Sequence, residues 1–188
     1  MLLEQVVRLL DLQPGQVVVD GTVGIAGHSR AMIKAIMPGG FLLGLDQDPQ
    51  VAELAARELI SAGFTREEQY DVEVRRFSQF DLALASRHIS GFDRMLLDIG
   101  VNSLHLDQAE RGFSLKREGP LDMRMNPSDP LTRSAAEVVA SEDEATLAGI
   151  FERFGEERFA RRIAREIVKA RQVAPIQTTA ELREIVAK

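Results

Sequence analysis

The alternation of short apolar runs with helical patterns most constrains the fold of the first hundred residues. Four apolar runs, at 16–20, 41–46, 71–77 and 92–98, are separated by turn residues and by stretches with amphipathic helical spacing. Strands that alternate with helices in this way are typical of a parallel, doubly wound sheet. We therefore expect an α/β fold in which four strands and three crossovers are complete by residue 98.

Three of these four runs end in an aspartate, namely Asp20, Asp46 and Asp98. In an open parallel sheet, ligands bind outside the carboxyl ends of the strands, where the strand order reverses. The three carboxylates are therefore expected to face one crevice. The loop after the first run, "DGTVGIAGHS" at 20–29, contains three glycines, and His28 is its only basic side chain.

This charge pattern limits which ligand the glycine loop can hold. A helix N-terminus with accessible amides attracts anions, but three carboxylates would repel a pyrophosphate that has no lysine or arginine beside it. S-adenosylmethionine fits better, because it carries a sulfonium, an ammonium and one carboxylate. Asp46 is then placed to accept the ribose hydroxyls, while Asp20 and the loop with Gly24 take the methionine end. Phe77 is placed to lie on the adenine ring. An NAD-type oxidoreductase is the rival enzyme class.

The end of the fourth run, "DIGVNS" at 98–103, offers polar groups for an amine substrate. Asp98, the Ile99 carbonyl and Asn102 or Ser103 are placed to accept its hydrogen bonds and to orient its nitrogen lone pair, so that in-line geometry supplies much of the rate. In the alternative, Asn102 and Ser103 only cap the next turn.

Composition excludes several classes of protein. The net charge of -6 argues against coating nucleic acid by bulk electrostatics, although basic residues cluster near 153–171. The chain has no cysteine, which excludes disulfides and thiolate chemistry and fits a cytoplasmic protein. No apolar run approaches the ~20 residues of a membrane span. The N-terminal residues resemble an amphipathic helix rather than a signal peptide. The three histidines lack metal-ligand spacing, so we propose no metal site.

The pattern changes near residue 103, which divides the chain into a cofactor domain at 1–103 and a helical domain at 104–188. We expect a long ordered loop at 104–133, in which Arg111 and Arg124 either contact RNA or clamp the structure through Asp122 or Glu110. Three capping boxes are expected to follow, starting at 134, 141 and 178. In "EERFARRIAREIVKAR", Phe159, Ile163 and Ile167 share one helix face. The other face carries a basic stripe, either solvated or in contact with RNA phosphates: Arg158, Arg161, Arg162, Arg165 and Lys169.

Six stretches carry a resemblance to a known family: "DGTVGIAGHS", "LDQDP", "DIGVNS", "LDQAERGFS", "GPLDMRM" and "FGEERFARRIA". In this order they resemble the signatures of the bacterial ribosomal RNA small subunit methyltransferase H family, also called MraW. The resemblance implies a class I, Rossmann-like S-adenosylmethionine fold with an inserted helical domain. It also implies methylation of a cytosine N4 amine in the 16S rRNA of the small ribosomal subunit. Its implied cofactor contacts are Ala26, Gly27, His28, Asp46, Phe77, Asp98 and His105.

The chain departs from the family pattern at three positions and at its ends. Ala26 stands where glycine is usual, and its methyl group crowds the backbone if the position needs a positive φ. Asn102 replaces a usual serine, and His105 replaces a usual glutamine. The segment that normally precedes "LLxE" and the family's last strands are absent. We therefore expect a truncated chain with an incomplete sheet, whose exposed fourth strand favours a homodimer. In a non-enzymatic alternative, the chain is an inactive relic that binds cofactor or RNA.

Overall fold

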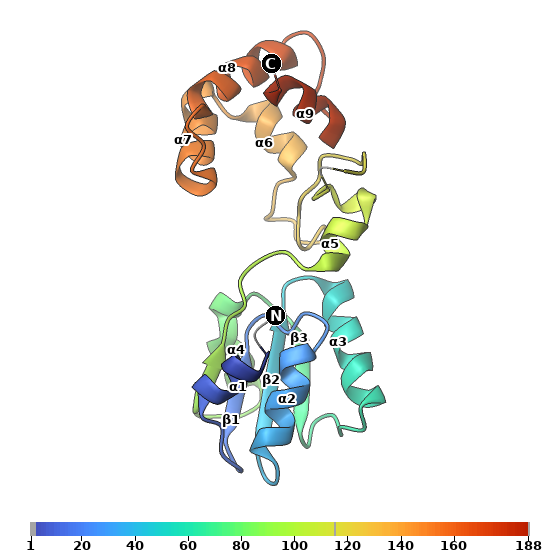
Figure 1. The fold of residues 1–188 in the computed structure, drawn as a ribbon, viewed down its shortest axis with the longest axis vertical. Coiled ribbons are helices and arrows are strands. Elements are labelled where there is room, and N and C mark those ends of the chain that lie inside the picture. The colour runs from blue at the N-terminus through green and yellow to red at the C-terminus, as the bar shows by residue number, and fades with distance from the viewer. Residues whose placement is uncertain (1–2, 115, 188) are drawn as a thin grey trace. The chain divides into compact units, whose positions relative to one another are not determined.

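The computed structural model describes residues 3–114 and 116–187, so residues 1, 2, 115 and 188 of the two expected domains lie outside it. The chain forms two compact units, Met1–Gly100 and Val101–Lys188, which are described separately (Figure 1). The first unit ends at Gly100, and Asn102 caps the first helix of the second unit.

The first unit is built on a four-stranded parallel sheet. Its strands are β1 (Val17–Asp20), β2 (Phe41–Asp46), β3 (Tyr70–Val74) and β4 (Arg94–Leu96), in the order β3-β2-β1-β4. The four expected strands are therefore confirmed. The strands at 71–77 and 92–98 are shorter than their apolar runs, so Asp98 lies two residues beyond β4 rather than in it.

Helices cover both faces of this sheet. The helices α1 (Leu3–Leu10), α2 (Gly27–Ile36) and α3 (Pro49–Ser61) pack with one face, and α4 (Phe80–Ser86), preceded by the 3-10 turn η1 (Phe77–Gln79), packs with the other. Neighbouring strand residues alternate between the faces: Val18 and Leu42 belong to the α2–α3 core, and Val19 and Leu43 to the α4 core. In the order β3-β2-β1-β4, β2 and β3 lie on one side of β1, and β4 lies on its other side. The strand order thus reverses between β1 and β4, where a ligand crevice is expected.

The second unit is helical. It contains α5 (Ser103–Asp107), the 3-10 turn η2 (Ala109–Arg111), α6 (Ala135–Ser141), α7 (Glu144–Gly155), α8 (Ala160–Arg171) and α9 (Thr179–Val186). Apolar side chains from α6, α7, α8 and the flanking loops form its core, namely Leu121, Val139, Leu147, Ala148, Ala164, Ile167 and Ile176.

Two expectations for this unit need correction. The segment 104–133 is not all loop, because α5 and η2 occupy its start. The capping box expected at Ser141 is wrong, because Ser141 ends α6 and the side chain of Asp143 caps α7 by accepting from Thr146 N. The capping boxes that begin at Ser134 and Thr178 are confirmed.

None of the helices in the described parts of the chain combines the length and apolar character that crossing a membrane requires.

Candidate functional site

The glycine loop requires glycine at two positions, Gly21 and Gly24, for two different reasons. Gly21 directly follows β1, and a Cβ there would lie 2.5 Å from Leu97 Cδ2 and 3.0 Å from Phe77 Cβ. Gly24 has a φ of +53°, in the left-handed region that favours glycine. The loop therefore combines a close approach of neighbouring segments with a left-handed turn.

Ala26 is also left-handed, with φ 62° and ψ 21°, and it immediately precedes α2. Its methyl group is fully buried in the core between the sheet, α2 and α3. The position therefore does require a positive φ, which costs an alanine of the order of 1–2 kcal/mol relative to a right-handed conformation.

Asp20 lies at the end of β1 and is 1% exposed. Its carboxylate accepts hydrogen bonds from Ser29 Oγ at 2.6 Å and from Thr22 N at 3.3 Å. Burial raises the pKa of Asp20 to about 6, against the lowering effect of the hydrogen bond from Ser29. The buried Asp20 carboxylate therefore links Thr22, near the start of the loop, to Ser29, at its end, by hydrogen bonds.

Asp46 ends β2 and faces the same loop. Its Oδ2 accepts from Gly24 N at 3.2 Å, and its Oδ1 accepts from Asp48 N at 3.0 Å. The buried Asp48 then caps α3 by accepting from Gln50 N. The carboxylate of Asp46 is thus fixed by two backbone amides while its side chain stays partly exposed.

Asp98 and His28 bring the end of β4 to the same loop. Asp98 N donates to Thr22 Oγ1 at 2.7 Å, and Asp98 Oδ2 lies 3.9 Å from His28 Nδ1. The Asp98 side chain is 49% exposed, whereas that of His28 is 14% exposed. Among the described residues, no hydrogen-bond partner is found for the buried His28 Nε2. Hence Asp20, Asp46 and Asp98 lie around one loop, and Gly27 begins α2 with open space beside it. The expectation that all three carboxylates face a crevice is wrong for Asp20, because its side chain is buried and accepts hydrogen bonds from within the loop.

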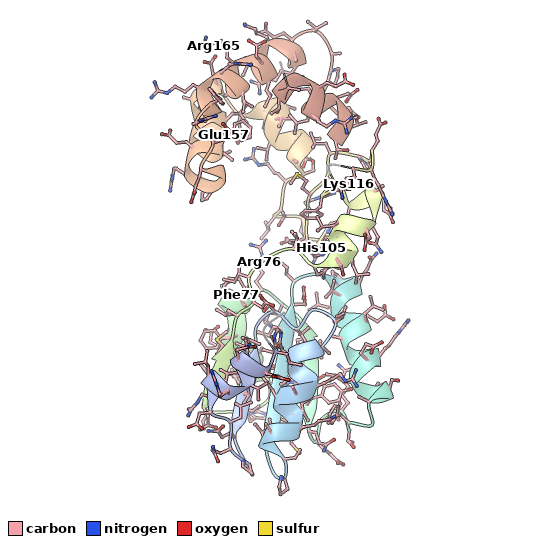
Figure 2. All side chains as sticks on the ribbon, viewed as in Figure 1. Arg76, Phe77, His105, Lys116, Glu157 and Arg165 are labelled. Atoms are coloured by element: carbon pink, nitrogen blue, oxygen red, sulfur yellow. The ribbon has the colours of Figure 1, made fainter. Side chains whose placement is uncertain are left out.

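Phe77 lies beyond the end of β3 and begins η1, next to Arg76 (Figure 2). Its side chain is 37% exposed, and its Cβ is close to the Gly21 backbone. An aromatic face is thus available at the carboxyl end of the sheet.

Asn102, Ser103 and His105 lie in the second unit. Asn102 Oδ1 accepts from His105 N at 3.0 Å, and His105 Nδ1 accepts from Asn102 N, which forms a capping box. The His105 ring is buried, with its centroid 5.1 Å from that of Phe113. The capping role weighed for Asn102 is therefore present, and His105 shares it, while Ser103 opens α5.

The basic side chains of the helical unit divide into two groups. Arg111 is buried and donates to the backbone oxygens of Arg124 and Met125. Arg124 forms a bidentate ion pair with Asp122. These two arginines clamp the loop. The five residues of the expected basic stripe, in contrast, are exposed.

Phe159 does not share the buried face of Ile163 and Ile167, contrary to expectation. It precedes α8 as the N-cap residue and is 50% exposed, whereas Ile167 is fully buried.

Sequence reasoning missed Thr22, Ser29 and Asp48. Thr22 and Ser29 lie inside the quoted loop, and Asp48 precedes Pro49 at the start of α3, which is a recognisable N-cap signal. The long-range partner of Thr22, Asp98 N, has no local signature in the sequence.

Comparisons with known proteins give a consistent result. A family model described as the MraW methylase family matches residues 1–188. The ribosomal RNA small subunit methyltransferase H of Syntrophotalea carbinolica is 46% identical over 97% of this chain and 56% of its own length. The protein of the same name from Thioalkalivibrio sulfidiphilus is 42% identical over all of this chain and 58% of its own length.

The chain thus spans slightly more than half the length of these relatives. Among solved structures, a protein-L-isoaspartate O-methyltransferase aligns with 63% of this chain and 35% of its own, at 14% identity and a TM-score of 0.42.

Proposed function

Because the chain belongs to the MraW methylase family, we propose that it is an S-adenosylmethionine-dependent methyltransferase of ribosomal RNA. Its substrate is the N4 amine of a cytosine in the 16S rRNA of the small ribosomal subunit, and it acts in the cytoplasm. The relatives' shared name, ribosomal RNA small subunit methyltransferase H, supports the substrate.

The observation that carries the proposal is the acidic rim of the glycine loop. Asp20, Asp46 and Asp98 surround it, and residues 20–29 contain no lysine or arginine. A cationic ligand with one carboxylate fits this charge, and a pyrophosphate does not. His28 Nε2, for which no partner is found among the described residues, and the accessible start of α2 at Gly27 are polar groups suited to the cofactor's carboxylate end.

Each cofactor residue then has a role that its contacts suggest. Asp46 accepts the ribose hydroxyls, and Phe77 packs against the adenine ring. Asp20 acts from inside, by holding the loop through Thr22 and Ser29. Gly24 and Ala26 supply the left-handed backbone that the turn needs. Asn102 and His105 are positioning residues, because their capping box fixes the start of α5.

When bound, S-adenosylmethionine supplies an electrophilic methyl group. The carboxylate of Asp98 and the carbonyl oxygen of Ile99 accept hydrogen bonds from the cytosine amine and orient its lone pair. Asp98 would also receive the proton that the amine gives up when the methyl group moves to its nitrogen, which breaks the bond from carbon to the sulfonium and leaves a neutral thioether. Ser103, at the exposed start of α5, is a polar group that the second unit offers to RNA.

RNA and a second copy of the chain are the proposed partners. The five residues of the basic stripe contact phosphates, which favours binding at low salt. In the described parts of the chain, β4 has no strand on its outer side, and an open edge of this kind favours pairing between copies.

Transfer of a radiolabelled methyl group to small ribosomal subunits tests this function. We expect the 188-residue chain to label a cytosine, and Asp98→Asn to reduce the rate about a hundredfold. Asp81→Asn, an exposed change on α4, should leave the rate unchanged. Unlabelled subunits, in the presence of a chain that binds the cofactor, would contradict the catalytic claim and support the inactive alternative.

A further inference from the structure

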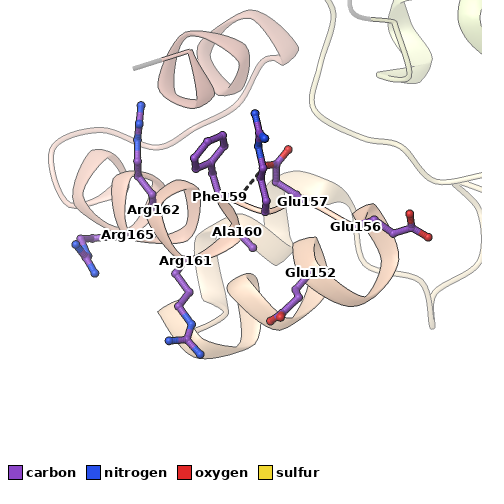
Figure 3. A pocket seen from close by; sticks show the side chains of 9 residues that line it. Glu152, Glu156, Glu157, Phe159, Ala160, Arg161, Arg162 and Arg165 are labelled. Atoms are coloured by element: carbon purple, nitrogen blue, oxygen red, sulfur yellow. Dashed lines mark hydrogen bonds between the residues drawn. The ribbon is translucent and has the colours of Figure 1, made fainter.

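A cavity of about 680 Å³ opens where α7 turns into α8, and its lining includes no residue of the proposed cofactor site. Its lining combines four arginines, three glutamates and one aromatic ring, Phe159. Figure 3 shows Arg162 and Phe159 pointing to the same side at the start of α8, while Arg161 and Arg165 project from the helix in other directions. The site is therefore a mixed aromatic and charged pocket within the second unit.

Phe159 is the unusual feature of this pocket. Its ring is half exposed and lies outside the unit's apolar core. The guanidinium carbon of Arg158 lies 4.8 Å from its centroid, and that of Arg162 lies 5.9 Å away. Two cations thus share one solvent-exposed ring. Aromatic rings and guanidinium planes of this kind are the surfaces on which unpaired RNA bases stack.

The cations of the pocket are poorly neutralised by the protein. Arg165 lies 3.6 Å from Glu144, but within the described part of the chain no carboxylate is recorded at ion-pair distance from Arg158, Arg161 or Arg162. Glu157, which also lines the pocket, accepts a hydrogen bond from Phe159 N at 2.8 Å. Arg161 and Arg162 also stand in the first turn of α8, where the helix dipole disfavours positive charge. A bound anion would relieve both repulsions.

Charge alone does not describe the site. Four arginines against three glutamates leave a single net positive charge, which attracts a generic polyanion only weakly. A ligand that gains from the pocket must also use the ring. Duplex RNA offers phosphates but keeps its bases stacked inside, whereas unpaired RNA offers both phosphates and free base faces.

We propose that the α7–α8 pocket binds an unpaired segment of RNA, with a base stacked on the Phe159 and arginine surface and a phosphate held by Arg161 and Arg165. This inference rests on the proposed function and deepens it, since it names unpaired rather than duplex RNA as the form that the helical unit recognises.

Fluorescence anisotropy with the 188-residue chain tests the proposal. The probes are a short unpaired RNA, the same RNA annealed to its complement, and heparin, which is a polyanion without bases. We expect the unpaired RNA to bind most tightly. Phe159→Leu keeps an apolar side chain but removes the ring face, and it should weaken unpaired RNA binding about tenfold without changing its salt dependence.

Two arginine variants separate the pocket from general charge. Arg161→Gln should lower the slope of log affinity against log salt by about one. Arg57→Gln removes another exposed arginine, on α3 and outside the pocket, and should change neither affinity nor slope. Because Phe159 and Arg161 lie outside the core, all three variants should retain the wild-type circular dichroism and melting temperature.

Equal binding of duplex RNA or heparin, an unchanged affinity of Phe159→Leu, or no binding of RNA at low salt would each overturn the proposal. A parallel titration with S-adenosylmethionine separates the two claims. If one of these RNA results occurs while the chain still binds S-adenosylmethionine, only this inference is rejected. If the chain does not bind S-adenosylmethionine, the proposed function is rejected.

Discussion

Single residues decide whether the glycine loop keeps its shape. Ala26 is fully buried and left-handed, so a larger side chain there meets two penalties, crowding and backbone strain. Asp20 is a buried carboxylate that hydrogen-bonds to Thr22 and Ser29 of the loop. The family resemblance singled out position 26, but only the backbone angles show that it is left-handed.

Ala26→Val should lower the free energy of unfolding by more than about 2 kcal/mol, because a β-branched residue at positive φ adds strain to overpacking. Ala55→Val is the matched control, since Ala55 is equally buried but lies in the regular helix α3. Ala26→Gly should stay within about 1 kcal/mol of wild type, because strain relief offsets the lost methyl burial. Urea denaturation measures all three, and equal losses for the two valine variants would contradict the strain argument.

Asp20 should make the first unit less stable as the pH rises from about 4 to about 6. Its pKa is raised to about 6 in the folded protein and is 3.8 in a model peptide, so the folded state binds the proton more tightly. The stabilising effect of the proton is complete below about pH 4 and is lost above about pH 6, a change of about 3 kcal/mol. Asp20→Asn should remove this slope in urea denaturations across that pH range. A slope that persists in the variant would assign it to another group.

At the scale of helices and strands, local signals predicted the fold well. The four strands follow from short apolar runs, and the capping boxes at Ser134 and Thr178 follow from their spacing. The signal failed at Ser141, because the same spacing occurs two residues before the true cap, Asp143, at the end of α6. It also failed at Phe159, because periodicity cannot show that α8 begins only at Ala160. Contacts between distant segments, such as that of Thr22 with Asp98, depend on the tertiary fold.

The two serines of α6 provide a direct test of this distinction. Ser134→Ala should destabilise the second unit by about 1 kcal/mol, because its Oγ accepts from Glu137 N at the helix start. Ser141→Ala should cost less than about 0.5 kcal/mol, because Ser141 ends the helix on the surface. Thermal unfolding followed by circular dichroism measures both losses of stability. A larger loss for Ser141→Ala than for Ser134→Ala would contradict the assignment of Ser134 as the cap.

At the scale of the whole molecule, the open side of β4 should govern association. The segment that follows β4 exposes apolar side chains, including Ile99 at 71% and Val101 at 47%. Sedimentation velocity should therefore show a dimer that forms as concentration rises, and Ile99→Lys should weaken it because a charge disfavours edge pairing. A sedimentation coefficient that stays at the value of a monomer at all concentrations would contradict the proposed homodimer.

The central claim is that the acidic rim of the glycine loop holds a cationic cofactor, and calorimetric titration of the 188-residue chain with S-adenosylmethionine tests it most directly. The account predicts binding at one site. Asp46→Asn should weaken that binding at least about tenfold, because a hydrogen bond to a charged acceptor contributes about 1.5–3 kcal/mol, while Asp81→Asn should bind as the wild type does. Heat from NAD with none from S-adenosylmethionine or its demethylated product, or an unchanged affinity of Asp46→Asn, would contradict it.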